Sequence, residues 1–137
     1  INAKAIIEKS GYIATKTKKF VSKKPKGKLV IAGSSSITPL MEKLVESYKS
    51  VNPNVVIEIQ QSDSTTGVNV VVEGIADIGM VSREVKEAEL KKGISVRVLA
   101  IDGLAIIVNK ANPITNITKD SVYKIFTGEM TTWDQVK

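Results

Sequence analysis

The sequence contains no cysteine and no histidine among its 137 residues. Without cysteine, the chain forms neither a disulfide nor a thiolate metal site. Without histidine, serine–histidine catalysis, histidine-bound metals and the usual general base near neutral pH are excluded. Aromatic residues make up only 4% of the chain, and no apolar run reaches the roughly 18 residues that a membrane-spanning helix needs. We therefore expect no catalytic residue, no metal, no cofactor and no membrane span.

What the chain does contain is enough apolar sequence for one globular domain, with 42% hydrophobic and 25% charged residues. Its net charge of +6 is unevenly placed. Residues 1–28 hold nine lysines against one glutamate, whereas residues 29–137 hold eleven basic and thirteen acidic groups. The basic charge therefore belongs to an N-terminal arm and not to the domain that follows it.

The lysines of this arm allow two interpretations. They could contact nucleic acid or an anionic surface, or they could form a solvated linker. We favour the linker and do not expect nucleic acid as a partner, because Phe20 is the one aromatic residue within residues 16–28 and this stretch has no arginine. The lysines concerned are Lys16, Lys18, Lys19, Lys23, Lys24, Lys26 and Lys28.

From residue 28 onward, strand-like and helix-like patterns alternate. The predicted strands are 28–32, 55–60, 76–81, 95–101 and 104–109, and the predicted helices are 38–50, 66–73, 85–92 and 118–126. Such alternation predicts βαβ units and an α/β fold with a mostly parallel sheet. In that arrangement the N-termini of the helices gather at the carboxyl edge of the sheet, where a ligand is expected to bind.

Small polar residues occupy three of the predicted strand-to-helix junctions. These junctions are Gly33-Ser34-Ser35-Ser36, Gln60-Gln61-Ser62-Asp63-Ser64-Thr65-Thr66-Gly67 and Gly79-Met80-Val81-Ser82-Arg83. Hydroxyl groups and free helix N–H groups suit a small, fully ionised oxyanion. The candidate ligands are Ser34, Ser35, Ser36, Ser64, Thr65, Ser82 and Arg83.

Three charged residues near these junctions have competing interpretations. Arg83 is either an anion ligand or one half of a surface ion pair with Glu84 or Glu87. Asp63 either caps the following helix, which we favour, or accepts the proton of a partly protonated anion. For Asp77 we expect a hydrogen bond to local backbone.

At these motifs the chain resembles the phosphate-binding proteins of ABC importers, which have the type II periplasmic-binding-protein fold. The resemblance runs from residue 28 to the end of the chain. Besides the first junction, it rests on Ser64-Thr65-Thr66-Gly67, on residues 73–84 (EGIADIGMVSRE), on residues 102–113 (DGLAIIVNKANP) and on residues 125–133 (IFTGEMTTW).

The resemblance implies one lobe of that fold, a three-layer α/β/α sandwich that binds inorganic phosphate without catalysis. The family's ligand contacts correspond to Ser35, Ser64 and Ser82, with Arg83 as an addition. It further implies an ABC transporter permease as the partner of the parent protein. The expected location is extracytoplasmic, either periplasmic or on the cell surface as a lipoprotein.

Two departures from the family pattern modify this expectation. Ser62-Asp63 stands where many relatives have a glycine-rich turn, and the arginine and Gly-Ser-Gly-Thr turn of the second lobe are absent. Residues 5–13 (AIIEKSGYI) resemble the family's closing segment, which here precedes the first lobe. We therefore expect a permuted or excised chain that binds phosphate weakly and whose exposed lobe surface supports a homodimer.

The expected division of the chain follows from these resemblances. Residues 1–15 form the helix that resembles the closing segment, 16–27 the lysine-rich linker and 28–110 the first lobe. Residues 111–137 follow the hinge strand and either begin the second lobe or pack on the first.

Several alternatives for function remain open. The ligand could be sulfate, molybdate or a small carboxylate in place of phosphate. A nucleophilic Ser35 or Ser64 is disfavoured, because the chain has no histidine, no Ser-x-x-Lys near either serine and no Gly-x-Ser-x-Gly. The lysine arm could tether the protein to a nucleic acid or a membrane surface, or the chain could be an isolated lobe without binding activity.

Overall fold

A computed structural model describes residues 3–16 and 20–136. Lys18 and Lys19 of the predicted linker lie outside the described residues. The contacts divide the chain into two units between Gly103 and Leu104, and each unit is described by itself.

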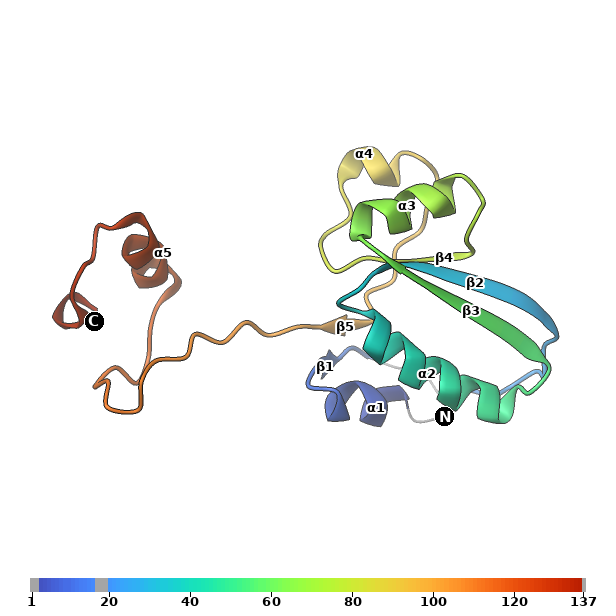
Figure 1. Ribbon diagram of the computed structural model, residues 1–137, viewed down its shortest axis with the longest axis horizontal. Coiled ribbons are helices and arrows are strands. Elements are labelled where there is room, and N and C mark those ends of the chain that lie inside the picture. Colours follow the sequence, from blue (N-terminus) through green and yellow to red (C-terminus); the bar gives the residue numbers. More distant parts are fainter. Residues whose placement is uncertain (1–2, 17–19, 137) are drawn as a thin grey trace. The chain divides into compact units, whose positions relative to one another are not determined.

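The first unit is built on a three-stranded parallel sheet. Its strands β2 (Gly27–Ser34), β3 (Val55–Ser62) and β4 (Ile78–Met80) lie in the order β3-β2-β4 (Figure 1). β-branched residues favour these extended segments. The register places Ser34 opposite Ser62 and Gly33 opposite Met80, so the carboxyl ends of the strands meet at one edge.

Two helices cover the sheet, one on each side. Helix α2 (Thr38–Val51) connects β2 to β3, and α3 (Ser64–Val72) connects β3 back past β2 to β4. The two connections run in opposite directions across the sheet, and right-handed crossovers therefore place the helices on opposite faces, as Figure 1 shows. The predicted α/β class with a parallel sheet and helices on both faces is confirmed.

The core of this unit lies between these layers. Its buried apolar residues come from both helices and all three strands, together with the turn before β4: Ile31, Ala32, Leu40, Val55, Val68, Ala76 and Met80. Burial of such side chains from water is the main force that holds the layers together.

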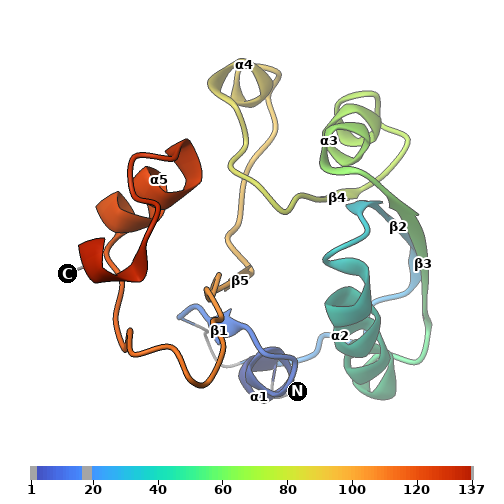
Figure 2. The same cartoon turned by 60° about the vertical axis from the view of Figure 1, so that its left-hand side comes forward.

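The N-terminal segment packs on the same unit. Helix α1 (Ala3–Lys9) contacts α2, and its Ile7 is only 2% exposed. Strand β1 (Ile13–Ala14) then pairs antiparallel with β5 (Ala100–Ile101) (Figure 2).

The described part of the predicted linker lies against the C-terminal end of α2. The ring of Phe20 lies 5.8 Å from that of Tyr48, measured between centroids. The Nζ of Lys24 donates a hydrogen bond to the carbonyl oxygen of Val51 at 2.8 Å. Basic groups near a helix C-terminus interact favourably with the helix dipole.

The second unit contains α5 (Lys119–Thr127) and the short 3₁₀ helix η1 (Trp133–Gln135). The Thr118 side chain accepts a hydrogen bond from the backbone N–H of Ser121, and Gly128 ends α5 with a φ of 81°. The predicted helix over 118–126, with its threonine cap and glycine stop, is confirmed.

Four predicted elements differ from the structure. The strand predicted for 76–81 is shortened to β4 (Ile78–Met80). The strand predicted for 95–101 is reduced to β5, and the helix predicted for 85–92 is reduced to α4 (Glu87–Leu90). The strand predicted for 104–109 is not formed, and Leu104 and Ile107 there are fully or almost fully exposed. A strand requires a neighbour to complete its ladder of hydrogen bonds, and in the part of the chain that the structure describes no segment pairs with 104–109.

None of the helices within residues 3–16 and 20–136 has the length and apolar character needed to cross a membrane.

Candidate functional site

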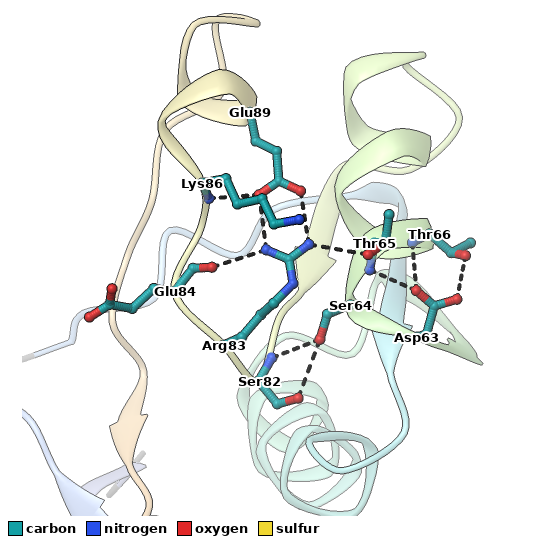
Figure 3. Close-up of polar contacts among 9 residues, drawn as sticks. All are labelled: Asp63, Ser64, Thr65, Thr66, Ser82, Arg83, Glu84, Lys86 and Glu89. Atoms are coloured by element: carbon teal, nitrogen blue, oxygen red, sulfur yellow. Dashed lines mark hydrogen bonds and ion pairs between the residues drawn. The ribbon is translucent and has the colours of Figure 1, made fainter.

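Three serine side chains meet at the carboxyl edge of the sheet, each from a different element. The Oγ of Ser34, at the end of β2, lies 2.9 Å from the Oγ of Ser82, which follows β4. The Oγ of Ser64, the first residue of α3, lies 3.3 Å from Ser82 Oγ and accepts a hydrogen bond from the Ser82 N–H at 3.1 Å (Figure 3). We call these three residues the serine cluster.

Glycine residues allow α3 to lie close enough to the sheet for this meeting. A Cβ on Gly67 would lie 2.8 Å from the carbonyl oxygen of Met80 and 2.9 Å from the Cα of Gly33. Gly33 itself has a φ of +131°, which other residues rarely adopt. Because backbone meets backbone here, the N-terminus of α3 reaches the ends of β2 and β4.

The N-terminus of α2 lies beside the serine cluster and has no side-chain cap. Its N-cap position is Ile37, and the exposed Ser35 and Ser36 precede it. The Ser35 N–H is already bonded to the carbonyl oxygen of Ser62, and the Tyr12 hydroxyl donates to the Ser36 carbonyl at 3.2 Å. An uncapped helix N-terminus carries partial positive charge that favours an anion.

Asp63 caps α3, as we predicted. Its Oδ1 accepts hydrogen bonds from the N–H groups of Thr65 and Thr66 at 2.7 and 3.0 Å, and its Oδ2 accepts from the Thr66 hydroxyl at 2.6 Å. The Thr66 hydroxyl bond, followed by the backbone bonds, lowers the pKa of the Asp63 carboxyl. The two helix N-termini therefore differ, because α3 has a charged cap and α2 has none.

Arg83 is held in an ion pair with Glu89. Its Nη2 donates to Glu89 Oε1 at 2.8 Å and to the Thr65 hydroxyl at 3.2 Å. Its Nη1 donates to Glu89 Oε2 at 2.9 Å and to the carbonyl oxygen of Glu84 at 3.0 Å. Figure 3 shows the guanidinium between Glu89 and Thr65.

The acidic partner that we predicted for Arg83 is therefore wrong. Glu84 offers only its carbonyl oxygen, and Glu87 pairs with Lys91. Sequence reasoning missed Glu89. The available signal was its position in the first turn of α4, three residues after Lys86, where a glutamate commonly bonds back to the backbone N–H.

The ion pair fixes the charge state of both partners. The hydrogen bond from Arg83, followed by the bond from the Lys86 N–H, lowers the pKa of Glu89 to about 2. The same pair raises the pKa of Arg83. Both groups are therefore ionised at neutral pH. The negative charge of Glu89 largely neutralises the positive charge that Arg83 brings to the site.

Asp77 bonds to backbone, although not to local backbone. Its Oδ2 accepts a hydrogen bond from the N–H of Val30 on the neighbouring strand β2 at 2.8 Å. The side chain thus stabilises the sheet at a distance from the serine cluster along β2.

The structure brings together most of the predicted site residues. Ser34, Ser64 and Ser82 form the cluster, and Thr65 and Arg83 lie beside it. Ser35 and Ser36 lie at the N-terminus of α2, directly after Ser34. No group of three acidic side chains that could hold a metal ion is found within the described ranges.

In parallel α/β folds, the loops at the carboxyl ends of the strands are where ligands bind. A family model described as the PBP superfamily domain matches residues 20–137, and the chain belongs to this superfamily.

Its relatives include named phosphate-binding proteins. The chain is 47% identical over 136 residues to phosphate-binding protein PstS 2 of Streptococcus agalactiae, covering 98% of the chain and 46% of that protein. It is 36% identical over 115 residues to phosphate-binding protein PstS of Bacillus subtilis, covering 82% of the chain and 38% of that protein. The chain spans about half the length of the curated relatives it matches.

Solved structures give the same result. A phosphate ABC transporter phosphate-binding protein from Streptococcus pneumoniae superposes with a TM-score of 0.85 at 38% identity, over 98% of this chain and 52% of that one. An ABC-type phosphate transport receptor from Vibrio cholerae gives 0.72 at 39% identity, over 80% of this chain and 44% of that one. The predicted resemblance to phosphate-binding proteins of ABC importers is confirmed.

The coverage also bears on the N-terminal segment. Because the Streptococcus agalactiae match spans 136 residues, it includes this segment.

Proposed function

We propose that this chain is one lobe of a solute-binding protein and binds inorganic phosphate, without catalysis, at its serine cluster and the N-terminus of α2. The observation that supports this proposal is the meeting of Ser34, Ser64 and Ser82 beside an uncapped helix N-terminus. The names of the relatives, which are phosphate-binding proteins, support the same ligand.

The chemistry of the site suits an anion that is held by neutral donors. The Ser82 hydroxyl links those of Ser34 and Ser64. Ser34 is buried, whereas the hydroxyls of Ser64 and Ser82 can rotate their hydrogens toward an oxyanion. The hydroxyls of Ser35 and Ser36 lie exposed at the start of α2. Thr65 and Arg83 extend the set of donors on the side of α3.

Phosphate would be only partly enclosed by this set of residues. We propose that the remainder of a longer protein supplies a second lobe, which closes on the anion and completes its coordination. The loaded protein would then deliver phosphate to the permease of an ABC transporter. An extracytoplasmic location, periplasmic or lipid-anchored at the cell surface, follows from that role.

For the organisation of the chain we propose that residues 1–15 are a closing segment placed ahead of residues 28–110. Residues 111–137 would begin the second lobe. Without that lobe, the exposed apolar side chains of 104–108 would favour homodimers.

A second oxyanion is favoured by one observation. Both carboxylate oxygens of Asp63 are taken by the cap of α3. This lobe therefore offers little to accept the proton of hydrogen phosphate, and sulfate or molybdate would compete with phosphate more effectively than in a complete cleft.

The test is a titration of the ¹⁵N-labelled chain with inorganic phosphate and, separately, with sulfate. We expect saturable shifts of the amide signals of residues 34–38, 64–65 and 82–83. Ser64→Ala should weaken binding about tenfold, the loss of one hydrogen bond to a charged ligand. Ser50→Ala, at the opposite end of α2, is the matched control and should bind as the wild type does.

Absence of phosphate-dependent shifts at millimolar concentration would contradict the proposal. So would equal binding by Ser64→Ala and wild type.

A further inference from the structure

Arg83 directly follows Ser82 and reaches across to α3, where its Nη2 donates a hydrogen bond to the Thr65 hydroxyl. An arginine side chain has many rotamers, and holding it in one of them costs conformational entropy. The feature that holds it here is Glu89, which accepts from both Nη atoms.

Glu89 is itself held firmly. Its side chain is only 12% exposed, against 29% for that of Arg83. Besides the two bonds from Arg83, its Oε2 accepts the backbone N–H of Lys86 at 2.7 Å. Helix α4 has no buried residue, and the Arg83–Glu89 pair is therefore a principal link between α4 and the start of α3.

The ion pair leaves part of the guanidinium available. Both hydrogens of Nη1 and both of Nη2 have acceptors, namely Glu84 and Glu89 for the first and Thr65 and Glu89 for the second. Within the described residues, Nε–H has no acceptor. Glu89 thus fixes the two Nη atoms of the guanidinium. The Nε–H of Arg83 and the hydroxyl hydrogen of Thr65 are left to bond to a ligand.

We propose that Glu89 is a positioning residue for the anion site, which acts through Arg83 and strengthens phosphate binding although it adds a negative charge beside the ligand. This inference rests on the proposed function. Simple electrostatics predicts the opposite sign, because removal of a nearby carboxylate charge should favour an anion. The two explanations are therefore separable by experiment.

The experiment measures the dissociation constant for inorganic phosphate by NMR titration of the wild-type chain, Glu89→Gln, Arg83→Gln and the double variant. Arg83→Gln should bind about tenfold more weakly and Glu89→Gln about threefold more weakly, as expected for losing and for loosening a charge-assisted bond. In the Arg83→Gln background, Glu89→Gln should no longer weaken binding.

Two further measurements separate positioning from a general loss of structure. Glu87→Gln, in the same helix, removes an exposed carboxylate that pairs with Lys91 and should bind as the wild type does. The Nε–Hε signal of Arg83 should be sharp in the wild type and broadened in Glu89→Gln.

Equal or tighter binding by Glu89→Gln would overturn the inference and leave the proposed function intact. So would an equal loss from Glu89→Gln with and without Arg83, because Glu89 would then act independently. Failure of the wild-type chain itself to bind phosphate would overturn both proposals.

Discussion

Asp63 shows how one residue sets the balance of charge at this site. Its carboxylate occupies the N–H groups of Thr65 and Thr66, which would otherwise be free to bind an anion. Hydrogen bonds lower its pKa, so the group is ionised at neutral pH. The cap therefore stabilises α3 while it repels anions from the Ser64 side of the site.

Replacement of this charge should strengthen anion binding. Asp63→Asn keeps a side-chain oxygen that caps α3, because asparagine is as good an N-cap as aspartate. We expect phosphate to bind roughly threefold more tightly, because one repelling charge beside a well-hydrated site is removed. Calorimetric titration checks this.

The matched control is Asp120→Asn, which makes the same change at an exposed carboxylate of α5. Weaker phosphate binding by Asp63→Asn at unchanged melting temperature would mean that the carboxylate assists the ligand.

Residue roles were predictable from the sequence where they depend on near neighbours. The caps by Asp63 and Thr118 involve backbone N–H groups two or three positions along, so the sequence pattern alone identifies them. The pairing of Arg83 with Glu89 was not predictable in the same way, because it depends on how the loop between β4 and α4 turns. Glu84 and Glu87 are closer to Arg83 in sequence, but the carboxylate of neither pairs with it.

At the scale of elements, the decisive contact is between α3 and the sheet. Gly67 of the helix lies against Gly33 and the backbone of Met80 with no room for a side chain. This contact sets the depth at which the N-terminus of α3, and hence Ser64, meets Ser82.

Gly67→Ala should therefore both destabilise the fold and weaken the site. The added methyl would lie 2.8 Å from backbone, and overpacking of this kind costs about 1–3 kcal/mol. We expect a lower midpoint in urea denaturation and weaker phosphate binding.

Gly103→Ala is the control, because a Cβ there meets nothing within 4 Å. Unchanged stability of Gly67→Ala would mean that α3 moves away from the sheet at little cost, and the close contact would then not determine the position of Ser64.

The elements themselves were predictable to different degrees. Four elements have a clear hydrophobic periodicity and end at turn residues, and all four are present in the structure. They are the strands around residues 28–32 and 55–60 and the helices around 38–50 and 118–126. The segment 104–109 has an equally strong apolar pattern but forms no strand. Its pattern fits an extended conformation, but the hydrogen-bonding neighbour that a strand needs is a property of the fold and not of the segment.

At the scale of the molecule, the N-terminal segment is part of the first unit. Ile7 is 2% exposed in the contact of α1 with α2, and the Tyr12 hydroxyl reaches the Ser36 carbonyl at the N-terminus of α2. The segment therefore supports the same helix whose N-terminus forms part of the proposed anion site.

Truncation of the buried side chain tests this support. Ile7→Ala should lower the free energy of unfolding by about 2–5 kcal/mol, the usual range for a buried isoleucine. Ile13→Ala, at a side chain that is 60% exposed, should cost no more than about 0.5 kcal/mol. Urea denaturation followed by circular dichroism measures both.

Equal stability of the two variants would mean that α1 contributes little to the unit.

The pairing of β1 with β5 has a consequence for how this protein folds during synthesis. In this pairing Ile13 lies opposite Ile101, and Ala14 lies opposite Ala100. The contact therefore joins the start of the first unit to its end. The parallel sheet needs only residues 27–80 and can assemble as soon as these have left the ribosome. Contacts between residues far apart in sequence form slowly, because a long loop must close first. Strand β1 can therefore form its native pairing only after β5 has been translated, when the parallel sheet can already be in place.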